Sequence, residues 1–246
     1  MRELARRFTS HYPVIADPAV RARKGIKIAR VLQAALEGRR AGVILDIGCS
    51  NCLALDAICE ELRPSYAIGI DMDVDAIARP TTERATIVGD AQRLPLPDAS
   101  VDLIVCNHVY EHVPDPKQLF SEIERVLKPD GLCYFGAASR LTVMEPHFRL
   151  PFLSWLPKGL AGLYMRLTGK GTHYYENLRT LGGIRRLISG FSVLDFTLEV
   201  IENPDKFYAR DLLPRGGLLE RVPSLVWRYL YRVLPSYIFI LKRRSN

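Results

Sequence analysis

The chain has 246 residues, of which 48% are hydrophobic and 25% charged, and this composition excludes extended disorder and suits one large globular domain. Its five cysteines all lie within the first 133 residues, and their odd number favours reduced thiols in a cytoplasmic protein over a disulfide framework. The net charge of +7 is uneven, since residues 1–40 and 203–246 are basic and residues 41–202 are acidic. Basic ends are typical of a protein that meets an anionic surface or acceptor, and equally of solvated arginine faces.

The first half of the chain alternates short apolar runs with helical patterns. The apolar spacing predicts helices over 25–36, 53–62, 75–78 and 116–127, and strands over 43–47, 66–70, 85–88, 103–106 and 131–136. Apolar strands that alternate with helices indicate a parallel sheet buried on both faces.

The alternation is interrupted after residue 139. A segment rich in Pro, Leu and aromatic residues precedes a predicted helix over 178–188 and a strand over 191–200, and a second interruption precedes a last strand over 237–241. We therefore expect an α/β, Rossmann-like three-layer sandwich with a seven-stranded, mostly parallel sheet whose last strand is antiparallel. The predicted organisation is one domain over 1–246, with a helical cap over 1–40 and insertions over 140–175 and 203–235 that lie over or beside an acceptor site.

Polar residues follow the predicted strands at the points where each strand ends. Open parallel sheets bind ligands outside the carboxyl ends of their strands, so these residues are the candidate site. The four strand ends read LDIGCSNC from residue 45, GIDMD from 69, GDA from 89 and CNHVYEHV from 106. A carboxylate after the second strand offers paired acceptors to two vicinal ribose hydroxyls.

These segments resemble the class I methyltransferases that use S-adenosylmethionine (SAM), particularly those of ubiquinone and menaquinone biosynthesis. The resemblance rests on LDIGCSNC, GIDMD, GDAQRLPLPDASVDLIVCNHVYEHV and EIERVLKPDGLCYF, in the order and spacing of that family. It implies SAM as cofactor and S-adenosylhomocysteine (SAH) as product. The residues that it places around SAM are Asp46, Gly48, Cys49, Ser50 and Asn51 at the methionine part, Asp71 at the ribose, Met72, Asp90 and Ala91 at the adenine, and Asn107 and His108 near the methyl group.

The first loop departs from the family pattern, because Ser50 and Cys52 stand where the family has its second and third glycines. Cys52 adds a sulfur where the following helix approaches the cofactor, which leaves open a non-catalytic protein that kept the fold for binding. Cys49 and Cys52 lack two further zinc ligands at suitable spacing, so no metal site is expected.

The candidate bases for removing the acceptor's proton are His108, His147 and His173. His108 ends the fourth strand, whereas the other two lie in the first insertion. A structural histidine is the alternative interpretation for each, and His112 in Glu-His-Val is interpreted as structural.

The insertions bear on the acceptor. The apolar segment 150–167 suits a hydrophobic pocket or lid, or simple packing on the sheet. Over 221–234, Arg221, Arg228 and Arg232 share one helical face beside an aromatic and apolar surface, which suits an anionic membrane, a dimer contact or the sheet.

The sequence favours methyl transfer, with oxygen as the expected target, to a small hydrophobic, lipid-linked or glycan-precursor acceptor. The expected location is the cytoplasm, with peripheral contact at the inner face of the membrane. An RNA or nucleic-acid methyltransferase is the alternative, but Asn107-His108-Val109-Tyr110 replaces the Asn/Asp-Pro-Pro-Tyr/Phe of amino-methylating enzymes. The oligomeric state is left open.

Overall fold

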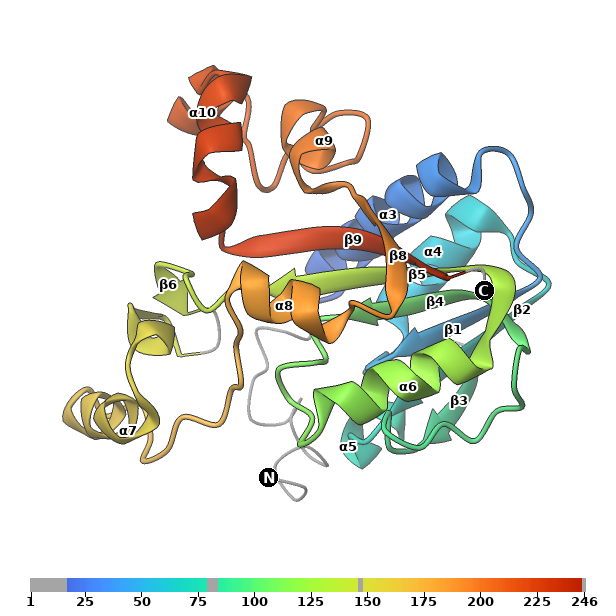
Figure 1. Ribbon diagram of the computed structural model, residues 1–246, viewed down its shortest axis with the longest axis horizontal. Helices are drawn as coiled ribbons and strands as arrows, with labels where there is room; N and C mark the ends of the chain where they lie inside the picture. The colour runs from blue at the N-terminus through green and yellow to red at the C-terminus, as the bar shows by residue number, and fades with distance from the viewer. Residues whose placement is uncertain (1–16, 79–83, 146–147, 245–246) are drawn as a thin grey trace.

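A computed structural model describes residues 17–78, 84–145 and 148–244 and places a seven-stranded sheet at the centre of the molecule (Figure 1). The strand order is β3-β2-β1-β4-β5-β9-β8, and β9 is antiparallel to both of its neighbours whereas the other pairs are parallel. The predicted fold class is confirmed. The strands are β1 Val43–Ile47, β2 Tyr66–Asp71, β3 Ala85–Val88, β4 Val101–Asn107, β5 Leu127–Ala138, β8 Phe191–Asp195 and β9 Ser236–Arg243.

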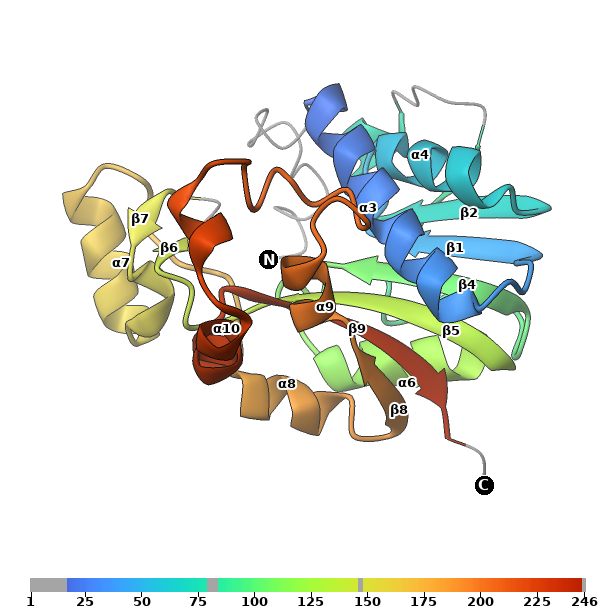
Figure 2. The same ribbon diagram turned by 90° about the horizontal axis from the view of Figure 1, so that it is seen from above.

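Helices cover both faces of the sheet (Figures 1 and 2). On one face lie α3 (Pro18–Leu36) and α4 (Leu53–Leu62), and on the other α6 (Pro116–Val126) and α8 (Leu181–Leu187); the short α5 (Val74–Ile77) follows β2. The helix α3 lies close to α4 at Gly25, where an added Cβ would be 2.3 Å from the carbonyl oxygen of Ala54. This close contact fixes which side of α3 faces α4.

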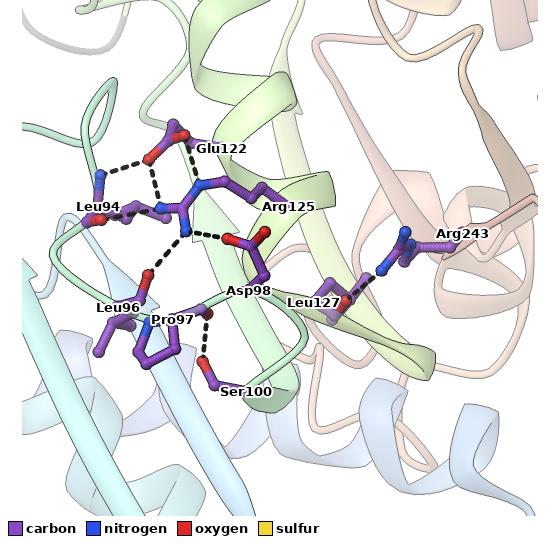
Figure 3. Close-up of polar contacts among 9 residues, drawn as sticks. All are labelled: Leu94, Leu96, Pro97, Asp98, Ser100, Glu122, Arg125, Leu127 and Arg243. Atoms are coloured by element: carbon purple, nitrogen blue, oxygen red, sulfur yellow. Dashed lines mark hydrogen bonds and ion pairs between the residues drawn. The ribbon is translucent and has the colours of Figure 1, made fainter.

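Arg125 at the end of α6 fastens the segment between β3 and β4 (Figure 3). Its guanidinium donates to the carbonyl oxygens of Leu94 and Leu96 and to the carboxylates of Asp98 and Glu122, at 2.7–2.9 Å. Glu122 in turn accepts the Leu94 N–H at 2.7 Å. Two of the sequence motifs are therefore joined by one arginine, which fixes the loop that follows the candidate adenine-binding turn.

The structure corrects two predicted elements of the second half. The strand predicted over 191–200 ends at Asp195, because the Asp195 carboxylate accepts the Thr197 N–H and a helix, α9 (Thr197–Glu202), follows. Buried Phe196 and Val200 belong to this turn of helix, and their apolar spacing fits either structure. The helix predicted over 178–188 begins only at Leu181, since Arg179 pairs with Ser139 as an extended bridge.

The two insertions lie at the end of the sheet where the parallel strands finish (Figure 2). The first contains β6 (Met144–Glu145), β7 (Leu150–Pro151), η2 (Leu153–Trp155) and α7 (Lys158–Leu167). The second contains η3 (Leu218–Arg221), α10 (Ser224–Leu230) and η4 (Tyr231–Val233). The helical pattern over 221–234 is thus divided between these short helices. Within the described ranges, no helix combines the length and the apolar composition that crossing a bilayer requires.

Candidate active site

The candidate site lies where β1, β2 and β4 end side by side. The chain crosses from β1 to β2 on one side and reaches β4 on the other, so β1 and β4 flank the point at which the strand order reverses. Crevices at such points are the usual ligand sites of open α/β sheets. The loop after β1 is held against β2 by the N–H groups of Gly48 and Cys49, which donate to the Ile70 carbonyl at 2.8 and 3.2 Å.

Asp71, the predicted ribose ligand, joins this loop to the end of β2. One carboxylate oxygen accepts the Ser50 N–H at 2.7 Å, and the other accepts the Asp73 N–H at 2.8 Å. Burial raises the pKa of Asp71 above its ordinary value, and the two backbone N–H groups oppose that rise. Each oxygen retains a second lone pair, so the carboxylate can accept two vicinal hydroxyls while it orders the loop.

The two cysteines of the loop point into the core. Ser50 and Cys52 both adopt the left-handed backbone conformation, with φ of 52° and 63°, which the family's glycines adopt readily. A Cβ added to Gly69 of β2 would lie 2.6 Å from the Cys49 sulfur and 2.8 Å from the Cys52 sulfur. Both sulfurs therefore pack over β2 in the core. The expectation that the Cys52 sulfur would meet the cofactor is wrong, because the left-handed backbone directs it inward.

Asp46 at the end of β1 is buried, and the charges of two cations that the sequence analysis did not identify act on it. Burial raises the pKa of Asp46 to about 7, against the opposing charges of Arg21 and Lys24 on α3. Burial likewise lowers the pKa of Lys24 to about 8. One buried carboxylate beside two cations matches the ammonium and carboxylate of an amino acid, so these residues fit the methionine part of SAM. Their spacing of three on a helix just before β1 was the available signal.

The predicted adenine residues form a turn beside Asp71. Asp90 accepts the backbone N–H and the side-chain amide of Gln92, at 2.9 and 3.1 Å. The Gln92 amide oxygen accepts the Asp115 N–H at 2.8 Å and so ties this turn to the start of α6. Ala91 is buried, whereas Met72 is half-buried at the end of β2. Met72 and Ala91 offer apolar contact and Asp90 an acceptor, which suits the adenine of a nucleoside.

The end of β4 carries a paired histidine and carboxylate. His108 has φ of 57°, and its N–H donates to the Gly136 carbonyl at 2.9 Å. The Nδ1 atom of His108 lies 3.3 Å from Glu111 Oε1, and Glu111 is fully buried. Burial alone would raise the pKa of Glu111, but the hydrogen bond and charge of His108, with the charge of His112, hold it below its ordinary value. Asn107 lies so close to Gly136 that a Cβ there would be 2.1 Å from its amide oxygen.

A second histidine, His112, interpreted from sequence as structural, pairs with Glu176, the residue that follows the first insertion. His112 Nδ1 lies 2.8 Å from Glu176 Oε2, and although burial acts to lower its pKa, the bond to Glu176 raises it to about 9. His173 is exposed and lies 2.9 Å from the Thr172 hydroxyl, while its neighbour Tyr174 is buried. The catalytic role predicted for His173 stays a prediction. His147 lies outside the described residues.

Tyr174 faces the carboxylates of this region. Burial, together with the negative charges of Glu145, Glu176 and Glu111, raises the pKa of Tyr174 well above its ordinary value. Glu145 and Glu176 are buried as well, and the charges of Glu111, Glu145 and Glu176 all raise the pKa of His112. Over the described ranges, no group of three or more such side chains is arranged to hold a metal ion.

Residues 45–135 match a protein family described as a methyltransferase domain, and this stretch holds the ends of β1 to β4. Over residues 45–135, the chain therefore carries a SAM-dependent methyltransferase domain. The family predicted from the motifs, and SAM as the cofactor of the domain, are thereby confirmed.

Two relatives and one solved structure are similar to this chain over a larger part of its length. The chain is 31% identical over 153 residues to a malonyl-[acyl-carrier protein] O-methyltransferase of Marinomonas sp., covering 58% of this chain and 54% of that protein. It is 27% identical over 146 residues to a ubiquinone biosynthesis O-methyltransferase of Histophilus somni, covering 54% and 56%. The plantazolicin methyltransferase BpumL, solved with SAH, shares the fold with a TM-score of 0.61 at 18% identity, over 96% of this chain and 89% of that one. The chain thus spans about half the length of the curated relatives it matches.

Proposed function

We propose that the chain transfers the methyl group of SAM to an oxygen atom of a small hydrophobic or lipid-linked acceptor. The observation that carries this proposal is Asp71, half-buried at the end of β2 and bonded to the loop after β1, where a nucleoside sugar would lie. Asp46 with Arg21 and Lys24 supports it, because together they complement an amino-acid zwitterion. The two O-methyltransferases among the relatives support oxygen as the target.

SAM supplies an electrophilic methyl carbon on a sulfonium, so the protein has to align the acceptor and remove its proton. His108 is the base of this proposal. With the Glu111 carboxylate ionised, its Nδ1 carries the proton of the 3.3 Å hydrogen bond, and Nε2 is then the nitrogen that accepts a proton from the acceptor hydroxyl. Glu111 stabilises the imidazolium that results. In this proposal the acceptor enters from the side of the first insertion, which contains Tyr174.

The direct test incubates the full chain with methyl-labelled SAM and fractionated cell extract, and identifies the labelled product by mass. Label in an organic-extractable compound with a new methoxy group supports the proposal. Label in RNA favours the nucleic-acid alternative, whereas SAM binding with no transfer to any fraction favours the non-catalytic one. The variant His108→Gln should retain SAM binding and lose at least about a hundredfold in transfer rate.

We further propose that the enzyme works at an anionic membrane surface from the cytoplasmic side. In α10, half-buried Trp227 packs on the core whereas Leu225 and Tyr229 are 75% and 87% exposed. In α7, Leu160 and Leu167 are 55% and 77% exposed. Large exposed apolar side chains concentrate in the two insertions, and these carry a strong excess of Lys and Arg over acidic residues. Such a surface suits an interfacial position on anionic lipids.

The double variant Arg228→Glu with Arg232→Glu should weaken flotation with anionic liposomes by more than about tenfold, because each basic residue near such a surface contributes on the order of 1 kcal/mol. SAM binding should be unchanged. The matched control is Arg39→Glu with Arg40→Glu, the same change of charge in the exposed turn between α3 and β1, at the other end of the sheet. An equal loss of flotation in both double variants would show that net charge alone causes the effect. If neither variant lost flotation, α10 would not contact the membrane.

A further inference from the structure

Two adjoining hollows lie between α6, α8 and the first insertion. The larger has a volume of about 790 Å³ and extends from Lys117 on α6 to Arg186 on α8. The smaller, of about 330 Å³, extends to Lys158 at the start of α7. Both are lined by Arg140, Leu178 and Arg179, so they form one groove, which we name the α6–α8 groove. It lies beside the site described above and shares only Glu176 and Tyr174 with it among the described residues.

The α6–α8 groove is strongly basic. Five cations line it, against the carboxylates of Glu124 and Glu176, and Glu176 already pairs with His112. Over the part of the chain that the structure describes, none of the five forms an ion pair within 4.0 Å, whereas Arg84, Arg125 and Lys128 elsewhere each do. The five cations are Lys117, Arg140, Lys158, Arg179 and Arg186.

Two of these cations are held in place by main-chain carbonyls rather than by carboxylates. Arg140 donates to the carbonyl oxygens of Ser154 and Trp155, and Lys158 donates to those of Tyr174 and Glu176. Such bonds fix the side chains without neutralising their charge. The positive charge therefore stays available to a ligand.

Arg179 lines both hollows of the groove, and two hydrogen bonds fix its main chain. Its N–H donates to the Tyr110 hydroxyl at 3.1 Å, and its carbonyl accepts the Arg140 N–H at 2.9 Å. Its Nε atom is buried and has no hydrogen-bond partner. A buried guanidinium nitrogen without a partner costs about 1–3 kcal/mol, a cost that an anionic ligand would relieve. The planar guanidinium fork matches the oxygens of a phosphate.

We infer that the α6–α8 groove binds a phosphate group of the methyl acceptor. This inference rests on the proposed function, and it narrows the acceptor class to phosphate-bearing molecules. The inner end of the groove at Glu176 adjoins His112, and the peptide N–H of Asn177 donates to the carbonyl of Glu111, the partner of His108. A molecule held by its phosphate at Arg179 is thereby directed toward the end of β4. The same chemistry serves a phospholipid headgroup and a water-soluble phosphate ester.

The test uses the full chain with two probes, inorganic pyrophosphate and phosphatidylcholine vesicles that contain phosphatidic acid. The double variant Arg179→Gln with Arg186→Gln should bind both probes more than about tenfold more weakly. Each substitution removes a charged hydrogen bond to the phosphate. The control is Arg185→Gln, which removes a neighbouring arginine of α8 that lies outside the groove and 3.9 Å from Asp195. SAM affinity and thermal unfolding, measured on every variant, report whether the fold and cofactor site are intact.

Pyrophosphate binding that depends on Arg179 and Arg186, but not on Arg185, supports a soluble phosphate ester as ligand. The same dependence seen only with the vesicles supports a lipid headgroup. Absence of binding to either probe, or equal losses in the variant and its control, overturns the inference. Because these assays need no methyl transfer, phosphate binding by a protein that fails to transfer methyl groups would contradict the proposed function and leave the groove as a binding site.

Discussion

The substitution Asp71→Ala should weaken SAM binding by more than about tenfold, a loss of at least about 1.4 kcal/mol. Its carboxylate is the acceptor placed for the two ribose hydroxyls, and it also holds the Ser50 N–H at 2.7 Å, so its removal affects both the ligand contact and the order of the loop. Calorimetric titration of the folded protein with SAM and with SAH measures the effect.

The matched control is Asp98→Ala, which removes an exposed carboxylate paired with Arg125 and remote from the crevice. SAM affinity should then equal that of the wild type. Thermal unfolding of both variants shows whether the loss at Asp71 is local. An affinity that stays unchanged in a folded Asp71→Ala protein would contradict the assignment of the crevice as the cofactor site, and with it the proposed activity.

The free energy of unfolding should fall by up to about 3 kcal/mol between pH 6.5 and 9 through His112 alone. The pKa of His112 is raised to about 9 in the folded protein, above the 6.5 of the unfolded chain. The native state therefore holds a proton that the unfolded state releases in this range. The stabilisation is complete below pH 6.5 and is lost as the pH rises through 9. Urea unfolding at a series of pH values measures the slope.

The variant His112→Gln should flatten this slope, being less stable than the wild type at pH 6 and close to it above pH 9. Glu176 is the carboxylate that stabilises the protonated imidazole, since it is buried and lies 2.8 Å from it. The control is His173→Gln, which replaces an exposed histidine of the first insertion. This variant should retain the wild-type slope. Identical slopes for wild type and His112→Gln would show that the His112–Glu176 pair does not cause the pH dependence of the free energy of unfolding.

The part of the site built from strand ends was accessible from the sequence. Parallel strands that start in register also finish together, so Asp46, Asp71 and Asn107 had to meet once the strand–helix alternation was recognised. The loop chemistry was less accessible, because the side to which a cysteine sulfur turns depends on a backbone angle. At Cys52, φ of 63° directs the sulfur over Gly69, whereas the letters alone suggested a sulfur against the cofactor.

Contacts between distant segments required the three-dimensional structure. The charges of Arg21 and Lys24 act on Asp46 because α3, which lies against α4 at Gly25, brings them near the end of β1. The pairing of His112 with Glu176 joins the segment after β4 to the segment after the first insertion, and no local pattern encodes it.

Local pattern therefore determined the α/β architecture with its parallel strands, because hydrophobic period and strand-end position act over a few residues. The motifs at the strand ends carried the resemblance to the methyltransferase family. Tertiary packing alone decided which charges are paired and which face a groove. The interaction energy of two charges depends on their distance in space, and it is larger where the charges are buried. For this reason, the sequence did not indicate that the five cations of the α6–α8 groove lie together. They come from α6, α7, α8 and the segments around these helices.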